Sequence, residues 1–218
     1  MNPFTYNGKS YAVDHDGFLL DHDSWDENFA EGMAREAGIP HKLSADHWKV
    51  LRYIRKRYWE TGSCPLVYET CKSNGLTLHE LKVLFPTGYH RGACKVAGLS
   101  YKDEYLKHSP QDPSAKGQWF LAKNKIYRVD PLGFLIDPEE WDEQFASNYA
   151  LQMKIQEGLT DRHWKIIYFL RDCYLKNKHA PNVYETCEVN NLELDELERL
   201  FPTGYHRGAL KISGLRAG

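Results

Sequence analysis

The sequence predicts a mainly α-helical protein built from two tandem copies of a small orthogonal helical bundle, each of about five helices after a short N-terminal β-hairpin. Residues 17–99 align with residues 133–215 at a constant offset of 116 without a gap, and 41 of the 83 aligned positions are identical. Apolar residues recur at helical spacing in both copies, and an alternating segment opens each one. Copies of this size are typical of separate domains rather than of solenoid units.

The boundary between the copies is predicted at residues 110/111. Residues 1–110 then form module one, which retains Cys94, and residues 111–218 form module two, in which Leu210 replaces that cysteine. The segment between the aligned regions has the composition of a linker, with Pro110, Pro113, Ser114 and Gly117.

A β-hairpin is predicted at the start of each module. The segments FTYNGKSYAVD and QWFLAKNKIYRVD alternate aromatic or apolar residues with polar ones around Asn7-Gly8 and Lys123-Asn124. Such short central pairs between alternating segments are typical of tight hairpin turns.

Two helices should follow the hairpin. Ser24 is the expected N-cap of the first, with Asp26 and Glu27 favouring its first turn. Its apolar residues recur at helical spacing: Trp25, Phe29, Met33 and Ala37.

Ser44 is expected to begin the second helix in module one and Thr160 its counterpart. On these second helices Trp48 and Trp164 are interpreted as core anchors, and His47 and His163 as capping or hydrogen-bonding residues rather than metal ligands.

Three shorter helices complete each module. Pro65 and Pro181 should start the third, which carries Cys71 or Cys187 as a packing residue. Thr77 or Glu193 leads into the fourth, which Pro86 or Pro202 ends. The last, GACKVAGL or GALKISGL, is predicted to be one short helix that ends at glycine.

Composition favours a folded protein of the cytoplasm. The chain has 28 basic and 30 acidic residues, so neither module has the positive surplus that non-specific nucleic-acid binding needs. MNPFTYNGKS does not resemble a signal peptide, and no apolar run approaches a membrane span. The five cysteines form no CxxC pair, which argues against structural disulfides and a zinc site.

The chain resembles the DsrC/TusE family of sulfur-relay proteins, as a tandem, divergent member. The residues that carry the resemblance are the DxDGFL segment (Asp14 to Leu19), the Trp25 segment, LSADHWKVLRYIRKRY (Leu43 to Tyr58), Pro65 and LFPTGYHRGACKVAGL (Leu84 to Leu99). The resemblance implies a cofactor-free protein that binds sulfur-donor or sulfur-acceptor proteins, of the sulfurtransferase or sulfite-reductase type. It also implies sulfur transfer through cysteines, one of them on a C-terminal arm.

The chain departs from the family pattern at these cysteines. Module one keeps the family's second cysteine as Cys94, but the residues after Leu99 contain no cysteine. Module two has Leu210 in place of Cys94 and ends in Arg216-Ala217-Gly218. The family's two-cysteine chemistry within one arm is therefore excluded here.

Two interpretations of Cys94 stay open. Accepting a sulfane sulfur requires an accessible thiolate, and the flanking His90, Arg91 and Lys95 would increase the thiolate fraction. Alternatively Cys94 is a small residue packed under the last helix, as Leu210 at the equivalent position suggests.

The loop before Cys94 is identical in both modules although the cysteine is not. Its glycines are interpreted as architectural, because they permit tight turns. A partner-docking surface could use the residues Tyr89, His90 and Arg91, with Tyr205, His206 and Arg207 in module two. We favour docking for the two arginines.

Three functions compete. A sulfur-relay protein with Cys94 as its acceptor and module two as a docking module ranks first, and the tandem could then mimic a dimer of single modules. A regulatory or scaffold protein of sulfur metabolism ranks second. DNA binding ranks last, because the basic stripe Arg52, Arg55, Lys56 and Arg57 becomes Tyr168, Arg171, Asp172 and Cys173 in module two. No motif of an autonomous enzyme is present, so the chain is at most a sulfurtransferase or sulfur-carrier component.

Overall fold

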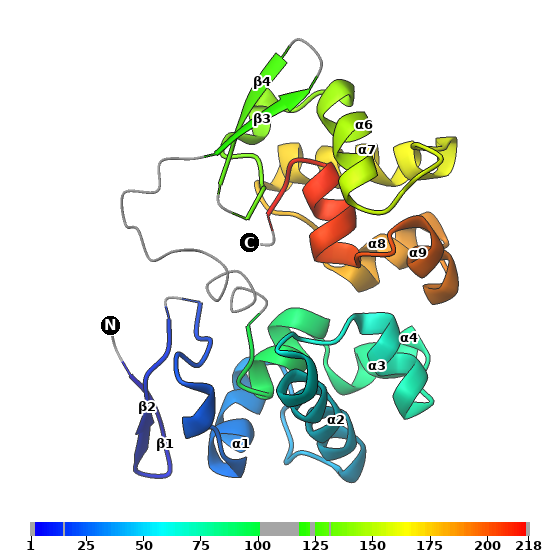
Figure 1. Cartoon of the computed structure of the whole chain (residues 1–218). Coiled ribbons are helices and arrows are strands. Elements are labelled where there is room, and N and C mark those ends of the chain that lie inside the picture. Colours follow the sequence, from blue (N-terminus) through cyan, green and yellow to red (C-terminus); the bar gives the residue numbers. More distant parts are fainter. Residues whose placement is uncertain (1–2, 15, 101–117, 123–124, 131, 217–218) are drawn as a thin grey trace. The chain divides into compact units, whose positions relative to one another are not determined.

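The computed structural model describes residues 3–14, 16–100, 118–122, 125–130 and 132–216 (Figure 1). The chain divides into two compact units, Met1–His108 and Ser109–Gly218, which are described separately below as modules one and two. The predicted boundary at 110/111 and the predicted linker residues fall within 101–117, outside the described residues.

Module one is mainly helical after a short hairpin, as predicted. In chain order its elements are β1 (Phe4–Tyr6), β2 (Lys9–Tyr11), the 3-10 turn η1 (His22–Ser24), α1 (Glu27–Glu36), α2 (Ala45–Thr61), α3 (Val67–Asn74), α4 (Leu78–Leu84) and the π-helical turn η2 (Tyr89–Cys94). Helix α1 packs on β1, α2 packs on both α3 and η2, and α3 packs on α4.

Module two repeats this order. Its elements are β3 (Gln118–Ala122), β4 (Lys125–Val129), η3 (Pro138–Glu140), α6 (Glu143–Gln152), α7 (Asp161–Asn177), α8 (Val183–Asn190), α9 (Leu194–Leu200) and the π-helical turn η4 (Tyr205–Leu210). Helix α7 packs on α8 and η4 just as α2 packs on α3 and η2. The predicted fold class, two helical modules each with a hairpin, is confirmed.

The hairpin of module one turns at Asn7 and Gly8, as predicted. Both residues have positive φ, 45° and 75°, as the tightest hairpin turns require. Strands β1 and β2 pair antiparallel, with Phe4 opposite Tyr11. In module two β3 and β4 also pair antiparallel, while the predicted turn at Lys123-Asn124 lies outside the described residues.

The predicted N-cap of the first helix was wrong. Helix α1 is capped by Asp26, whose carboxylate accepts a 2.8 Å hydrogen bond from the amide of Phe29. Ser24 instead belongs to the preceding 3-10 turn, where its hydroxyl donates to the carbonyl of Asp21. Trp25 between them is extended because its indole N–H donates to the carbonyl of Val96, 2.9 Å away, which delays the helix.

The second helices begin where the sequence predicted. Ser44 caps α2 and Thr160 caps α7, each in a capping box with the histidine three residues later. The prediction that Trp48 and Trp164 anchor the core was wrong, since both are half-buried. The fully buried positions of α2 lie on another face of the helix and comprise Val50, Leu51 and Ile54, together with Tyr58 at 3% exposure.

The remaining helices also match the prediction closely. Helices α3 and α8 begin two residues after Pro65 and Pro181. Thr77 and Glu193 are the N-caps of α4 and α9, which end one residue before Phe85 and Phe201 because a proline follows.

The segment that follows η2 is held by two neighbouring elements. The guanidinium of Arg55, on α2, lies 4.0 Å from the ring centre of Trp25 and donates a 2.9 Å hydrogen bond to the carbonyl of Ala97. Together with the bond from Trp25 to Val96, this fixes the chain directly after Cys94. Module two has the same arrangement, built from Trp141, Arg171, Ile212 and Ser213.

Candidate functional site

Cys94 is the last residue of the π-helical turn η2, and glycines on both sides shape this turn. Gly88 enters it at φ 113° and Gly98 ends the helical segment at φ 69°, two conformations that favour glycine. A Cβ on Gly92 would approach the side chain of Phe85 to 3.0 Å, so the turn packs closely on the end of α4. The predicted short helix ending at glycine is confirmed, but it begins earlier, at Tyr89.

The thiol of Cys94 is inside the module. Its exposed fraction is 1%, equal to that of Leu210 at the same position of module two. In this conformation a donor cannot reach the sulfur directly, so the thiol has to be uncovered before it can react with another protein.

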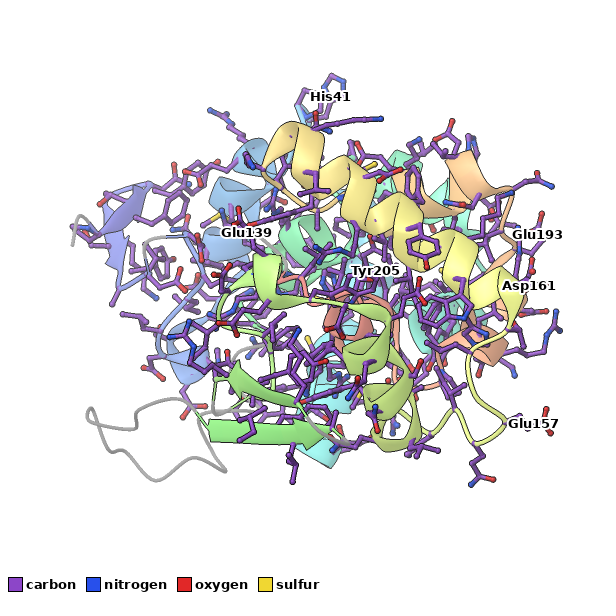
Figure 2. The ribbon with its side chains drawn as sticks, turned by 90° about the horizontal axis from the view of Figure 1, so that it is seen from above. His41, Glu139, Glu157, Asp161, Glu193 and Tyr205 are labelled. Atoms are coloured by element: carbon purple, nitrogen blue, oxygen red, sulfur yellow. The ribbon has the colours of Figure 1, made fainter. Side chains whose placement is uncertain are left out.

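The side chains of Tyr89 and Tyr205 point into their modules. The Tyr89 hydroxyl donates to the carbonyl of Pro65 at 2.7 Å and shares a 2.7 Å hydrogen bond with the hydroxyl of Thr70. Tyr205 makes the same two contacts, with Pro181 and Thr186. Tyr205, labelled in Figure 2, is 3% exposed, whereas Glu193, labelled at the edge of the same view, is exposed. Burial raises the pKa of both phenols.

Of the three basic residues next to Cys94, His90 and Lys95 face Phe18 rather than the solvent. The ring of His90 is 7% exposed and stacks on Phe18 with 4.8 Å between ring centres. The ammonium of Lys95 lies 5.9 Å from the centre of the same ring and 3.8 Å from a carboxylate oxygen of Glu36. Arg91 is exposed.

The matching residues of module two have a similar environment. The ammonium of Lys211 lies 5.3 Å and 5.5 Å from the ring centres of Phe134 and Tyr149, and burial lowers its pKa. His206 and Arg207 are half-buried. The candidate docking residues therefore divide into buried tyrosines, a buried His90, and the more accessible Arg91, His206 and Arg207.

The histidines near the second helices act as the sequence predicted. Nδ1 of His47 accepts a hydrogen bond from the amide of Ser44, and its Nε2 lies 2.8 Å from the carbonyl of Leu84. His163 makes the equivalent contacts, with Thr160 and Leu200. Burial lowers the pKa of both imidazoles.

The family model for DsrC-like proteins matches residues 5–103 and, a second time, residues 122–217. The chain belongs to this family. Among the DsrC-like relatives, the gamma subunit of dissimilatory-type sulfite reductase from Nitratidesulfovibrio vulgaris is 41% identical over 99 residues, which are 45% of this chain and 93% of that protein. The sulfurtransferase TusE of Salmonella choleraesuis is 34% identical over 104 residues, covering 43% of this chain and 91% of TusE.

The solved structures similar to this chain include one of a DsrC protein. The oxidised gamma subunit of the dissimilatory sulfite reductase (DsrC) from Archaeoglobus fulgidus is 34% identical, with a TM-score of 0.41, over 45% of this chain and 94% of that one. Each relative corresponds in length to one module, so the chain is a tandem of two DsrC-like modules.

The structure adds Cys64 to the candidate site around Cys94 in module one. No role was predicted for Cys64 from the sequence. Cys64 lies in the loop between α2 and α3, directly before Pro65, and is 7% exposed. Burial is the main cause that raises the pKa of the Tyr89 phenol, and the thiols of Cys94 and Cys64 lie near enough to add to it. A comparison of the two modules could have found Cys64, because Ala180 and Leu210 replace these two cysteines together.

Of the other cysteines in the two DsrC-like modules, Cys71 and Cys187 belong to the buried core and Cys173 does not. Cys71 and Cys187 are buried, and burial raises the pKa of each thiol to about 12. Such thiols stay protonated at neutral pH and are poor nucleophiles. Cys173 is half-buried, and burial raises its pKa as well. Among the described residues, no helix is long and apolar enough to cross a bilayer.

Proposed function

We propose that the protein relays sulfur between partner proteins, that module one accepts sulfur as a persulfide on Cys94, and that module two binds a partner without carrying sulfur. The observation that carries this proposal is the contrast between two nearly identical turns. The residues 84–93 and 200–209 are identical and their tyrosines make the same contacts, yet one turn ends in a thiol and the other in leucine. The scaffold is thus common to both modules while the reactive group belongs to one.

The names of the relatives support the class of partner. One relative is named as a subunit of dissimilatory-type sulfite reductase, and others are named as sulfurtransferases. We infer that the partners are a persulfide-bearing sulfur donor and an acceptor of the sulfite-reductase or sulfurtransferase type. All five cysteines are free, which fits the reducing conditions of the cytoplasm.

The acceptor step is a thiol exchange without an external oxidant. The Cys94 thiolate attacks the outer sulfur of the donor's persulfide, a bond forms between the two sulfurs, and the donor's own thiolate leaves. Because Cys94 is 1% exposed, this step requires the partner to displace the structure that covers it. The exposed Arg91 on the same turn is positioned to contact that partner.

A regulatory or scaffold protein without sulfur chemistry is the second candidate. The burial of Cys94 favours it, because Leu210 shows that the same position accepts an inert apolar side chain at the same 1% exposure. In that case both modules would bind partners, and replacing Cys94 would change nothing.

Intact-protein mass spectrometry after incubation with a persulfide donor distinguishes the two. The proposal expects the wild type and Cys173→Ser, a control in module two, to take sulfur from the donor, detected either as a gain of one sulfur mass or as released sulfide. Cys94→Leu, which reproduces the residue of module two, should show neither. Equal uptake by Cys94→Leu and the wild type contradicts the assignment to Cys94. No uptake by any variant, together with measurable partner binding, supports the scaffold protein instead.

The docking role of Arg91 is tested in the same system. Arg91→Glu should weaken binding to a dissimilatory-type sulfite reductase, measured by isothermal titration calorimetry, by about tenfold or more if the arginine is an interface anchor. Lys72→Glu, at an exposed residue of α3 in the same module, is the matched charge change on another element. Equal effects of the two variants would show that overall charge, and not this turn, governs binding.

A further inference from the structure

Two thiols of module one lie around a single buried hydroxyl. The Tyr89 hydroxyl donates to the carbonyl of Pro65 at 2.7 Å, and Cys64 is the residue bonded to the nitrogen of that proline. Cys94 is the fifth residue after Tyr89 on the same π-helical turn. Burial is the main cause of the raised pKa of Tyr89, and the thiols of Cys94 and Cys64 lie near enough to the phenol to add to it. The loop before α3 and the turn η2 thus place Cys64 and Cys94 near the same buried hydroxyl, that of Tyr89.

Both thiols are buried, but they lie in backbone segments of different structure. Cys64 follows α2, which ends at Thr61, and the intervening Gly62 has φ 75°. A Cβ on Gly62 would meet no atom of the described residues within 4 Å, so the loop has open space at this residue. Cys94 is held in η2 by hydrogen-bonded backbone on both sides. Cys64 is therefore on the more adaptable segment, so it is the thiol better able to approach the other.

Module two shows that the fold does not need either thiol. Its hydroxyl network is the same, with Tyr205 donating to Pro181 at 2.7 Å and bonded to Thr186 at 2.8 Å. At the positions of the two cysteines it has Ala180 and Leu210, and Leu210 is as buried as Cys94. The packing cysteine, by contrast, is present in both modules as Cys71 and Cys187. The pair of Cys64 and Cys94 thus belongs to module one alone.

We propose that Cys64 is the resolving thiol for a persulfide on Cys94, closing a Cys64–Cys94 disulfide within module one and releasing the carried sulfur as hydrogen sulfide. This inference rests on the proposed function, because it takes the Cys94 persulfide as its starting point. It adds a residue and a product to that function.

The step balances without a further reactant. The sulfur of Cys64 attacks Sγ of Cys94, the new Sγ–Sγ bond forms, and the bond between Cys94 Sγ and the outer sulfur breaks. The outer sulfur takes the electron pair of the broken bond and the proton that Cys64 gives up, and leaves as hydrogen sulfide. The two cysteines together lose two electrons, which the departing sulfur gains. A later reduction by a dithiol returns the pair to its starting state.

The test uses the full chain incubated anaerobically with a persulfide donor. Intact mass and released sulfide are measured, followed by peptide mapping without reductant. We expect the wild type to lose two hydrogens, to release one sulfide per chain, and to give a peptide in which Cys64 and Cys94 are linked. Cys64→Ala, which carries the residue of module two, should instead retain the added sulfur on Cys94 and release sulfide no faster than Cys94→Leu. Cys173→Ser should behave as the wild type does.

The outcomes separate this inference from the proposed function. A wild type that keeps the added sulfur on Cys94 and forms no link overturns the resolving role of Cys64, while sulfur carriage on Cys94 stands. If no variant takes up sulfur, the proposed function fails, and the pair is tested by itself with diamide, which oxidises neighbouring dithiols. A Cys64–Cys94 link in the diamide-treated, folded chain then supports a redox pair, and a link elsewhere or none overturns it.

Discussion

The substitution Asp26→Ala should destabilise module one because the carboxylate of Asp26 joins the hairpin to the first helix. It accepts hydrogen bonds from the amide of Phe29 at 2.8 Å and from the hydroxyl of Tyr11 at 2.7 Å, and it pairs with the ammonium of Lys9 at 2.5 Å. Alanine removes the N-cap acceptor and leaves the hydroxyl of the buried Tyr11 without its acceptor.

The magnitude follows from these two losses. Removal of an N-cap costs about 1 kcal/mol, and a buried hydroxyl without an acceptor costs about 1 kcal/mol more. The ion pair adds little, since both partners are more than a third exposed. We therefore expect the free energy of unfolding of module one to fall by about 2 kcal/mol, equivalent to a melting temperature lower by about 10 °C for a module of this size.

The assay is urea denaturation combined with hydrogen-exchange mass spectrometry, which reports on peptides of each module separately. Asp142→Ala is the matched variant, because Asp142 makes the same contacts with Lys125, Tyr127 and Phe145 in module two. Each variant should destabilise its own module. A loss below about 0.5 kcal/mol in module one would refute the claim that Asp26 holds the hairpin on the helix.

The same carboxylate makes a pH prediction. Burial acts to raise the pKa of Asp26, but the hydrogen bonds from Lys9, Tyr11 and Phe29 outweigh it and lower the pKa overall. A lowered folded-state pKa means that the stabilisation is fully present above the unfolded pKa of about 4 and is lost as the pH falls through the folded value. Asp26→Asn, which keeps an N-cap acceptor, should remove this acid-dependent part of the stability of module one.

Two further substitutions test the packing around the site. Gly98→Ala should cost about 2 kcal/mol or more, since Gly98 has φ 69° and a Cβ there would meet Trp25 at 2.5 Å. Gly62 has φ 75° but no such neighbour among the described residues, so Gly62→Ala should cost only about 1 kcal/mol. If chemical denaturation gives equal losses of unfolding free energy for the two variants, the contact with Trp25 is not the cause. Burial lowers the pKa of His47, so the unfolded chain binds a proton more readily and stability should decline as the pH falls below about 6.5. His47→Gln should flatten that decline in module one, as measured by urea denaturation at several pH values.

Local signals in the sequence were sufficient for most of the elements. Ser44, Thr77 and the Asn7-Gly8 turn act within a few residues of themselves, so their roles as caps and turn could be predicted from spacing. The same local signal gave a wrong prediction at Ser24, because serine is a favoured N-cap residue wherever it stands before a helix. The true cap, Asp26, is selected by Lys9 and Tyr11 of the hairpin and by the extended Trp25, which are contacts made across the fold.

The candidate site was found from the sequence only in part. The duplication and the family motif pointed to Cys94 and its loop, because identical letters at a constant offset need no structure to be recognised. Which side chains of this loop are exposed to solvent could not be predicted from the sequence. An aromatic or cationic residue in a loop can face either way, and the structure buries Tyr89 and His90 while leaving Arg91 exposed.

The sequence by itself determined that this protein is two DsrC-like modules in tandem and that one of them lacks the cysteine at the end of the turn. Periodicity, caps and repeats are local or linear properties of the chain, so they can be read without coordinates. Only the tertiary structure decided that Cys94 is enclosed and that Cys64 and Cys94 both lie near the Tyr89 hydroxyl. Residues thirty apart in the chain come together through the packing of α2, α3 and η2, and that packing is a property of the whole module.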